Sequence, residues 1–196
     1  MSVTTNKRVE EQQVFNLPNQ LTVLRLLLSL VLFVLINFEF YLSGVAVFCV
    51  AAGTDWLDGY FARKYGQVTN LGRILDPFVD KIIICGTFIF LVGLPGAGVQ
   101  AWMAVVIVGR ELLVTALRSY LEGEGADFSA SMSGKLKMAA QCLAAALSLY
   151  ALYDGSPEVR APALNWALSL SIWLAVGLTI YSGAAYVRRA VALIKR

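Results

Sequence analysis

The sequence predicts an all-α integral membrane protein with six transmembrane helices, and composition and length are the first observations that predict it. Of 196 residues, 58% are hydrophobic and 15% are charged, and the mean hydropathy is +0.68. Such a composition is typical of membrane proteins and not of soluble domains. Because one span needs about 20 mostly apolar residues, the chain has room for roughly six closely spaced helices and for no separate soluble domain.

Apolar segments separated by short polar breaks define the expected elements. Residues 1–15 are polar and lack the pattern of a removable signal peptide, and residues 1–19 are expected to form a cytosolic tail and juxtamembrane segment. Residues 20–196 are expected to form one six-helix domain. Asn19 is a plausible N-cap of the first helix, and the polar stretch from Tyr65 to Arg73 predicts a loop. The expected helices cover about 21–38, 42–64, 74–94, 100–121, 134–153 and 163–190.

The placement of basic residues is the third observation, and it predicts the topology. With a cytosolic N-terminus, three of the five connections lie outside, and these contain only Arg160 among the 16 lysines and arginines. The positive-inside rule therefore places both termini in the cytosol of a multi-pass protein in the inner (plasma) membrane. The same orientation brings the charged helix segments toward the cytosolic face, where a polar, metal-binding cavity can open.

Several classes of chemistry are excluded by what the sequence lacks. It contains no histidine, which removes imidazole bases and the usual nitrogen ligands of zinc and copper. The three cysteines, Cys49, Cys85 and Cys142, stand singly in apolar stretches and indicate neither a disulfide framework nor a metal site. No run of like charges indicates nucleic-acid binding. Any metal is therefore expected among oxygen ligands.

Four aspartates in expected membrane helices are the main functional signal. Asp55 and Asp58 lie three positions apart, and Asp76 and Asp80 lie four apart, so each pair shares a helix face. The short loop between the two helices predicts that they are antiparallel neighbours. Acidic residues inside a membrane helix are costly and indicate a functional site.

These carboxylates favour a hard divalent cation. Four like charges close together in a low dielectric need compensation, and carboxylate-only ligands select Mg²⁺ or Mn²⁺ over zinc, with Ca²⁺ also possible. Two ions bridged by the aspartates would form a two-metal site for phosphoryl chemistry. Gly59 and Ala62, on the same stripe as the first pair, would let a bulky ligand approach the helix backbone.

The spacing of these residues resembles the complete signature of the CDP-alcohol phosphatidyltransferases. The matching pattern is Asp55-x2-Asp58-Gly59-x2-Ala62-Arg63-x8-Gly72-x3-Asp76-x3-Asp80, at all eight fixed positions. The resemblance implies six transmembrane helices, a homodimer, and transfer of a phosphatidyl group from CDP-diacylglycerol to an alcohol with release of CMP.

The resemblance also implies a role for each residue of the signature. Asp55, Asp58 and Asp76 would be metal ligands, and Asp80 would be the general base and a further metal contact. The residues implied to bind CDP-diacylglycerol are Gly59, Ala62 and Gly72, lining the pocket, and Arg63, near the diphosphate.

Further motifs resemble the phosphatidylglycerophosphate synthase branch of this family. They are Asn16-Leu17-Pro18-Asn19-Gln20-Leu21-Thr22 with Arg25, Gly109-Arg110-Glu111-Leu112 with Leu117-Arg118, and Ser133-Gly134-Lys135-Leu136-Lys137. Met138 departs from the threonine that this branch often has there. The acceptor in this branch is sn-glycerol 3-phosphate, a component of phospholipid biosynthesis.

A dianionic acceptor needs cations, and four basic residues without an obvious partner are expected to bind its phosphate: Arg110, Arg118, Lys135 and Lys137. Arginine binds phosphate oxygens as a fork and lysine as a point charge. Arg110 and Arg118 could also pair with Glu111 or Glu122. Since Lys135 and Lys137 point to different sides of a helix, only one of them is expected to reach the phosphate.

The expected mechanism is direct attack of the acceptor hydroxyl on the phosphorus of CDP-diacylglycerol, with Asp80 taking the proton. Two alternatives keep this chemistry and change the acceptor to phosphatidylglycerol, as in cardiolipin synthases, or to inositol phosphate. An alternative of another class is a divalent-cation transporter. A transport pathway would place polar groups across the full membrane depth, whereas here they gather near one face.

Overall fold

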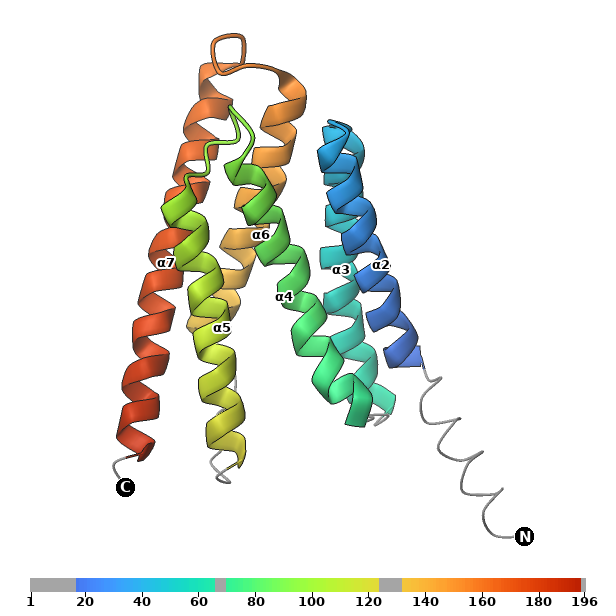
Figure 1. Ribbon diagram of the computed structural model, residues 1–196, viewed down its shortest axis with the longest axis vertical. Coiled ribbons are helices and arrows are strands. Elements are labelled where there is room, and N and C mark those ends of the chain that lie inside the picture. The colour runs from blue at the N-terminus through green and yellow to red at the C-terminus, as the bar shows by residue number, and fades with distance from the viewer. Residues whose placement is uncertain (1–16, 66–69, 124–131, 195–196) are drawn as a thin grey trace, which may run out of the picture. The chain divides into compact units, whose positions relative to one another are not determined.

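The computed structural model describes the backbone of residues 17–65, 70–123 and 132–194, and the side chains of 20, 22–54, 78–79, 81–121, 123 and 132–193. All of its regular structure in this part of the chain is α-helical (Figure 1). The helices are α2 (Leu17–Asn37), α3 (Tyr41–Tyr65), α4 (Asn70–Val92), α5 (Ala101–Gly123), α6 (Met132–Asp154) and α7 (Pro162–Ile194). The all-α prediction is confirmed, and each expected helix has a counterpart.

Two of the expected boundaries are wrong. The first helix begins at Leu17, before Asn19, so Asn19 lies inside the helix and is not its N-cap. Pro18 falls in the first turn, where its missing N–H has no intrahelical partner to lose. The loop expected up to Arg73 is shorter, because α4 already begins at Asn70 and includes Gly72. Of the expected tail (1–19), residues 17–19 belong to α2, and residues 1–16 lie outside the described residues, as does part of the connection before α6 (124–131).

The chain divides into two compact units, residues 1–86 and 87–196. The first contains α2, α3 and α4 as far as Gly86. The second contains the last turns of α4 together with α5, α6 and α7. Each unit contains its own candidate residues, the signature aspartates in the first and the basic residues of α5 and α6 in the second.

In the first unit, α2 and α3 form an antiparallel hairpin through a tight turn at Glu39. The backbone N–H of Glu39 donates to Ile36 O (3.1 Å), and that of Phe40 donates to Leu35 O (2.9 Å). This pair of bonds is the Schellman arrangement, in which the residue after the helix is left-handed. Glu39 has that conformation, with φ of 62°. The turn lets α3 start at Tyr41 and pack back along α2.

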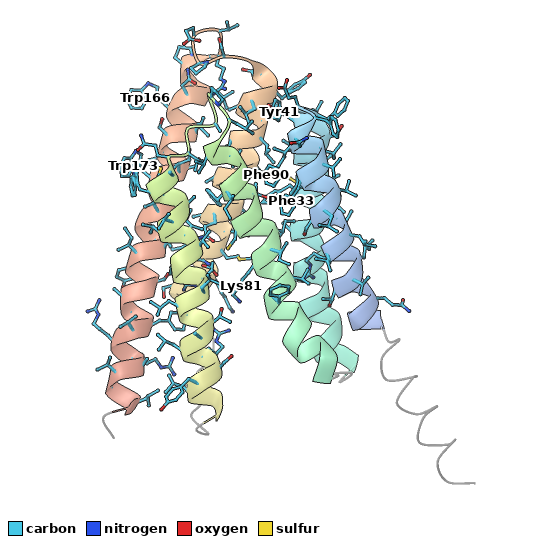
Figure 2. All side chains as sticks on the ribbon, viewed as in Figure 1. Phe33, Tyr41, Lys81, Phe90, Trp166 and Trp173 are labelled. Atoms are coloured by element: carbon cyan, nitrogen blue, oxygen red, sulfur yellow. The ribbon has the colours of Figure 1, made fainter. Side chains whose placement is uncertain are left out.

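The first unit is held by apolar side chains between its helices. Leu32 and Ile36 of α2 and Phe48 and Ala51 of α3 are at most 1% exposed. The helix α4 also contacts α2, where Phe33 faces it (Figure 2). A Cβ placed on Gly86 would lie 2.2 Å from Phe33 Cζ, so only glycine fits this approach.

In the second unit, α5 and α7 run in the same direction and α6 runs opposite to both. The ring centroids of Trp102, in the first turn of α5, and Trp173, in the first half of α7, are 5.8 Å apart. Further along the same two helices, Arg118 contacts Tyr186. On the second pair, α6 and α7, Gln141 Nε2 donates to Thr179 Oγ1 at 2.9 Å. The second unit therefore gathers the end of α5, the start of α6 and the end of α7.

At the opposite end of this unit, Arg160 joins the two connecting loops. Its Nη1 donates to Gly96 O (2.8 Å) in the α4–α5 loop, and its Nε donates to Gly155 O (2.7 Å) after α6. Gly96 has φ of 89°, and a Cβ there would meet Arg160 Nη2 at 2.8 Å. Only glycine suits that position. The guanidinium is buried and donates hydrogen bonds to these two backbone carbonyls.

Two of the described helices are long and apolar enough to cross a membrane, α6 over Met132–Asp154 and α7 over Pro162–Leu193. Shorter apolar stretches occur at Thr22–Asn37, Tyr41–Thr54 and Lys81–Val92. Exposed apolar side chains continue along the outward faces, as at Trp166 and Trp173 of α7 (Figure 2). The structure thus supports a helical, strongly apolar protein.

Candidate functional site

The four signature aspartates lie on the two helices that flank the short 66–69 connection. Asp55 and Asp58 are in α3, and Asp76 and Asp80 are in α4. Their side chains lie outside the described part of the structure. Among the side chains that are described, no group of three or more acidic or cysteine residues is placed to hold a metal ion.

Counted along the two helices, one aspartate of each pair lies at a similar distance from the 66–69 connection. Asp58 precedes the end of α3 at Tyr65 by seven residues, and Asp76 follows the start of α4 at Asn70 by six. At 1.5 Å per residue both lie roughly 10 Å from the connection. The two helices run in opposite directions within the first unit (Figure 1). This is the antiparallel arrangement that the sequence predicts for these segments.

The residues implied to bind CDP-diacylglycerol are on the same segments. Gly59, Ala62 and Arg63 lie in the last two turns of α3, and Gly72 lies in the first turn of α4. Their side chains are also outside the described part. Arg25 of α2 is described and is only 2% exposed. It is roughly as far from the α2–α3 turn as Asp55 is, about 20 Å at 1.5 Å per residue.

The second unit contains a cluster of charged side chains, here called the basic cluster: Arg110, Glu111 and Arg118 of α5, Lys137 of α6 and Tyr186 of α7. Glu111 is its acidic centre. Its Oε1 accepts a hydrogen bond from Arg110 Nη1 at 3.1 Å and one from Lys137 Nζ. The side chains of Arg110, Glu111 and Lys137 are 10%, 10% and 3% exposed. These ion pairs are therefore largely removed from solvent.

Arg118 joins the cluster through Tyr186. Arg118 Nη2 donates to the Tyr186 hydroxyl at 3.4 Å, a long hydrogen bond. The guanidinium of Arg110 lies over the face of the same ring, with Arg110 Cζ 5.4 Å from the ring centroid. This distance is within the range of a cation–π interaction. One tyrosine thus contacts both arginines that the sequence proposes as phosphate ligands.

The structure separates the two lysines at the start of α6. Lys137 is 2% exposed and is bound to Glu111, whereas Lys135 is exposed. Two residues correspond to about 200° on a helix, so the side chains leave on opposite sides. Lys137 begins the buried face that continues through Ala140, Gln141 and Ala144. Of the two, Lys137 lies in the basic cluster.

The cluster is an incompletely satisfied cation site. Among the described side chains, the basic cluster contains three cations and one carboxylate, which sum to a formal charge of +2. Arg110 Nε and Arg118 Nε are buried and have no hydrogen-bond partner among the described residues. Buried charge and buried donors are costly unless they are compensated. The arrangement is therefore suited to binding an anion that offers several oxygen acceptors.

Part of this geometry was not evident from the sequence. Arg110 binds Glu111, which is the pairing that the sequence left open, whereas the expectation that Lys137 has no partner is wrong, because it binds the same carboxylate. Tyr186 was not singled out as a site residue. Its signal is a tyrosine on a face of small residues in α7, with Gly183 one turn earlier and Ala190 one turn later. A Cβ on Gly183 would lie 3.1 Å from Arg110 Cγ, so this glycine makes room for the arginine stem.

Comparison with known proteins identifies the family of this chain. The sequence model of the CDP-alcohol phosphatidyltransferase family matches residues 15–181. A Bacillus subtilis protein named CDP-diacylglycerol–glycerol-3-phosphate 3-phosphatidyltransferase is 37% identical over 188 residues, covering 88% of this chain and 93% of the relative. Proteins of the same name from Pseudomonas fluorescens and Haemophilus influenzae are 35% and 34% identical. The alignments cover 89% and 81% of this chain and 90% and 89% of those relatives. With most of its length matched by the family model and by these relatives, the chain belongs to the CDP-alcohol phosphatidyltransferase family.

Proposed function

We propose that this protein transfers the phosphatidyl group of CDP-diacylglycerol to sn-glycerol 3-phosphate, giving phosphatidylglycerophosphate and CMP. Family membership and the names of relatives that are 34–37% identical support the reaction class. The observation that supports this acceptor most directly is the basic cluster, whose described side chains sum to a formal charge of +2 and include two buried guanidinium N–H groups without a described partner.

The charge of the cluster matches a phosphate monoester. Such a group carries about −1.5 to −2 charges at neutral pH and offers three acceptor oxygens. Arg110 and Arg118 would bind those oxygens as forks, and Lys137 would add a third cation. Lys135 belongs to the same proposal only as an outer contact, because its side chain is exposed. A neutral alcohol acceptor would bring no negative charge to balance the net positive charge of the described side chains in the basic cluster.

The residues proposed to bind the phosphatidyl donor and the metal ions lie on α3 and α4. Asp55, Asp58, Asp76 and Asp80 form an all-oxygen donor set that fits Mg²⁺ or Mn²⁺, with two ions proposed. Bound there, such ions would stabilise negative charge on the phosphoryl oxygens and on the departing CMP. Gly59, Ala62 and Gly72 would line the nucleotide pocket, since small residues admit a ligand close to the helix backbone.

The proposed reaction is a single displacement. Arg110, Arg118 and Lys137 bind the acceptor phosphate, which fixes the orientation of the primary hydroxyl at the other end of glycerol 3-phosphate. Asp80 accepts the proton of that hydroxyl. The hydroxyl oxygen of glycerol 3-phosphate then forms a bond to the phosphorus attached to diacylglycerol. The bond from that phosphorus to the CMP oxygen breaks, and Arg63 would contact the diphosphate. Positioning by the cationic side chains lowers the entropic cost of the attack.

We also propose that the protein crosses the inner membrane six times, with both termini and the site in the cytosol, and that it forms a homodimer. The apolar α6 and α7 and the exposed apolar side chains of α2 and α5 support membrane insertion. In the second unit, Arg110, Arg118 and Lys137 lie toward one end and Arg160 toward the other. The first three would face the cytosol under the positive-inside rule.

The test is CMP release by the purified protein with CDP-diacylglycerol and Mg²⁺ or Mn²⁺. Glycerol 3-phosphate, inositol phosphate and phosphatidylglycerol are compared as acceptors, with Asp80→Asn as the inactive variant. The proposal expects release only with glycerol 3-phosphate and its loss in Asp80→Asn. Release with phosphatidylglycerol or inositol phosphate instead would contradict the acceptor assignment. Folded protein that releases no CMP with any acceptor would contradict the enzymatic proposal and favour transport.

A further inference from the structure

Tyr186 is the shared contact of two arginines that lie eight positions apart on α5. Its ring packs under the Arg110 guanidinium, and its hydroxyl accepts from Arg118 Nη2. Both arginines lie on one helix, yet they are connected through a residue of another helix. Without this residue, Arg118 would lose its hydrogen bond to the hydroxyl, and Arg110 would keep its bond to Glu111 but lose the ring beneath its guanidinium.

The surroundings of Tyr186 explain how it can hold this position. The side chain is 3% exposed and packs with Val114 and Leu121 of α5 and with Ala190 of its own helix. Gly183, one turn earlier, leaves space for the Arg110 stem. Apolar packing therefore fixes the ring, while the ring face and the hydroxyl remain directed at two cations. For packing alone, a phenylalanine or leucine would serve.

We propose that Tyr186 is a positioning residue for the acceptor phosphate, which sets the spacing and orientation of Arg110 and Arg118 before the substrate binds. This inference depends on the proposed function, since it assigns the two arginines to the phosphate of glycerol 3-phosphate. Preorganised ligands bind more tightly because less conformational freedom is lost on binding. The predicted effect is thus on acceptor affinity and not on the chemical step.

Two substitutions separate the hydroxyl from the ring. Tyr186→Phe keeps the ring under Arg110 and removes the Arg118 contact, and we expect it to raise KM for glycerol 3-phosphate about threefold. Tyr186→Leu removes both contacts, and we expect a rise of roughly tenfold or more. KM for CDP-diacylglycerol is expected to stay unchanged in both. Tyr181→Phe is the matched control, because Tyr181 is on the same helix and exposed.

A double-mutant cycle tests whether the hydroxyl acts through Arg118. Tyr186→Phe is measured in the wild-type enzyme and again in Arg118→Ala. If the hydroxyl acts only by positioning Arg118, its removal has no further effect on KM once Arg118 is gone. Equal threefold effects in both backgrounds would overturn the inference, because the hydroxyl would then act independently of Arg118.

The remaining outcomes also decide the question. A lower kcat with unchanged KM for glycerol 3-phosphate, or variants indistinguishable from Tyr181→Phe, would overturn the positioning role. Thermal unfolding of each variant shows whether it is folded, and Tyr186→Phe keeps the packing that Tyr186→Leu loses. Failure of the proposed function is distinguishable, since the wild-type enzyme would then not release CMP with glycerol 3-phosphate at all.

Discussion

Lys137 of α6 and Glu111 of α5 form a buried ion pair between residues 26 positions apart. The same carboxylate also accepts from Arg110, its neighbour on α5. Glu111 therefore connects two of the three cations in the basic cluster and fixes the start of α6 against α5. The same ion pair therefore contributes to the packing of α5 against α6 and to the charge of the candidate phosphate site.

Lys137→Met is expected to weaken both acceptor binding and stability. It removes a cation from the cluster and leaves a buried carboxylate with a single partner. Breaking a buried ion pair in this way costs about 3 kcal/mol, which thermal unfolding in detergent would detect, and KM for glycerol 3-phosphate should rise. Lys135→Met is the matched control, since that exposed side chain should affect unfolding little. Equal effects of the two variants on unfolding would contradict the distinction between the lysines.

Arg110→Lys and Arg118→Lys are expected to raise KM for glycerol 3-phosphate about tenfold each, although the charge is kept. Lysine cannot bind two phosphate oxygens as a planar fork. The measurement is KM for each substrate in turn, and KM for CDP-diacylglycerol should not change. Arg188→Lys, an exposed position on α7, is the control. A change confined to KM for CDP-diacylglycerol would contradict this role and would assign the two arginines to binding of the donor.

Arg160→Lys is expected to lower stability without affecting catalysis. Its guanidinium joins the loops at Gly96 and Gly155, and lysine cannot make both hydrogen bonds in this geometry. The free energy of unfolding should fall by about 2 kcal/mol, measured by thermal unfolding alongside KM for both substrates. An altered KM for glycerol 3-phosphate at unchanged stability would contradict a purely structural role.

Gly86→Ala is expected to destabilise the first unit, because the new Cβ would overlap the Phe33 ring. Overpacking of this kind costs about 1–3 kcal/mol. Phe33→Leu in the same chain should recover part of the loss by vacating the space. Gly177→Ala is the control, since a Cβ there meets no atom within 4 Å. Destabilisation equal to that of Gly177→Ala would show that α2 and α4 do not pack closely at Gly86.

The sequence predicts the helices well because long apolar segments determine them, as in α3, expected over 42–64 and observed over Tyr41–Tyr65. Helix ends are less predictable. Asn19 has the chemistry of an N-cap, yet Pro18 in a first turn is equally compatible with a helix that starts at Leu17. Local signals of similar strength compete at such positions, and tertiary packing decides between them.

The residues of the candidate site also differ in how far the sequence predicts them. Spacing singles out the aspartates, and the motifs that resemble the family branch single out the basic residues of α5 and α6, since each set lies close together in sequence. The choice of Lys137 over Lys135 depends on which face of α6 packs against its neighbours. Tyr186 lies 68 positions after Arg118, and this contact depends on α5 and α7 running in the same direction. Such long-range contacts have no local pattern to predict them.

The measurement that tests the central claim most directly is the transfer of labelled glycerol 3-phosphate into lipid. The purified protein is incubated with CDP-diacylglycerol and Mg²⁺ or Mn²⁺, and the chloroform-soluble product is separated. We predict that the label enters a lipid carrying a terminal phosphate, in equal amount to the CMP released, and that Asp80→Asn forms none. CMP release with the label left in the aqueous phase would contradict glycerol 3-phosphate as the acceptor.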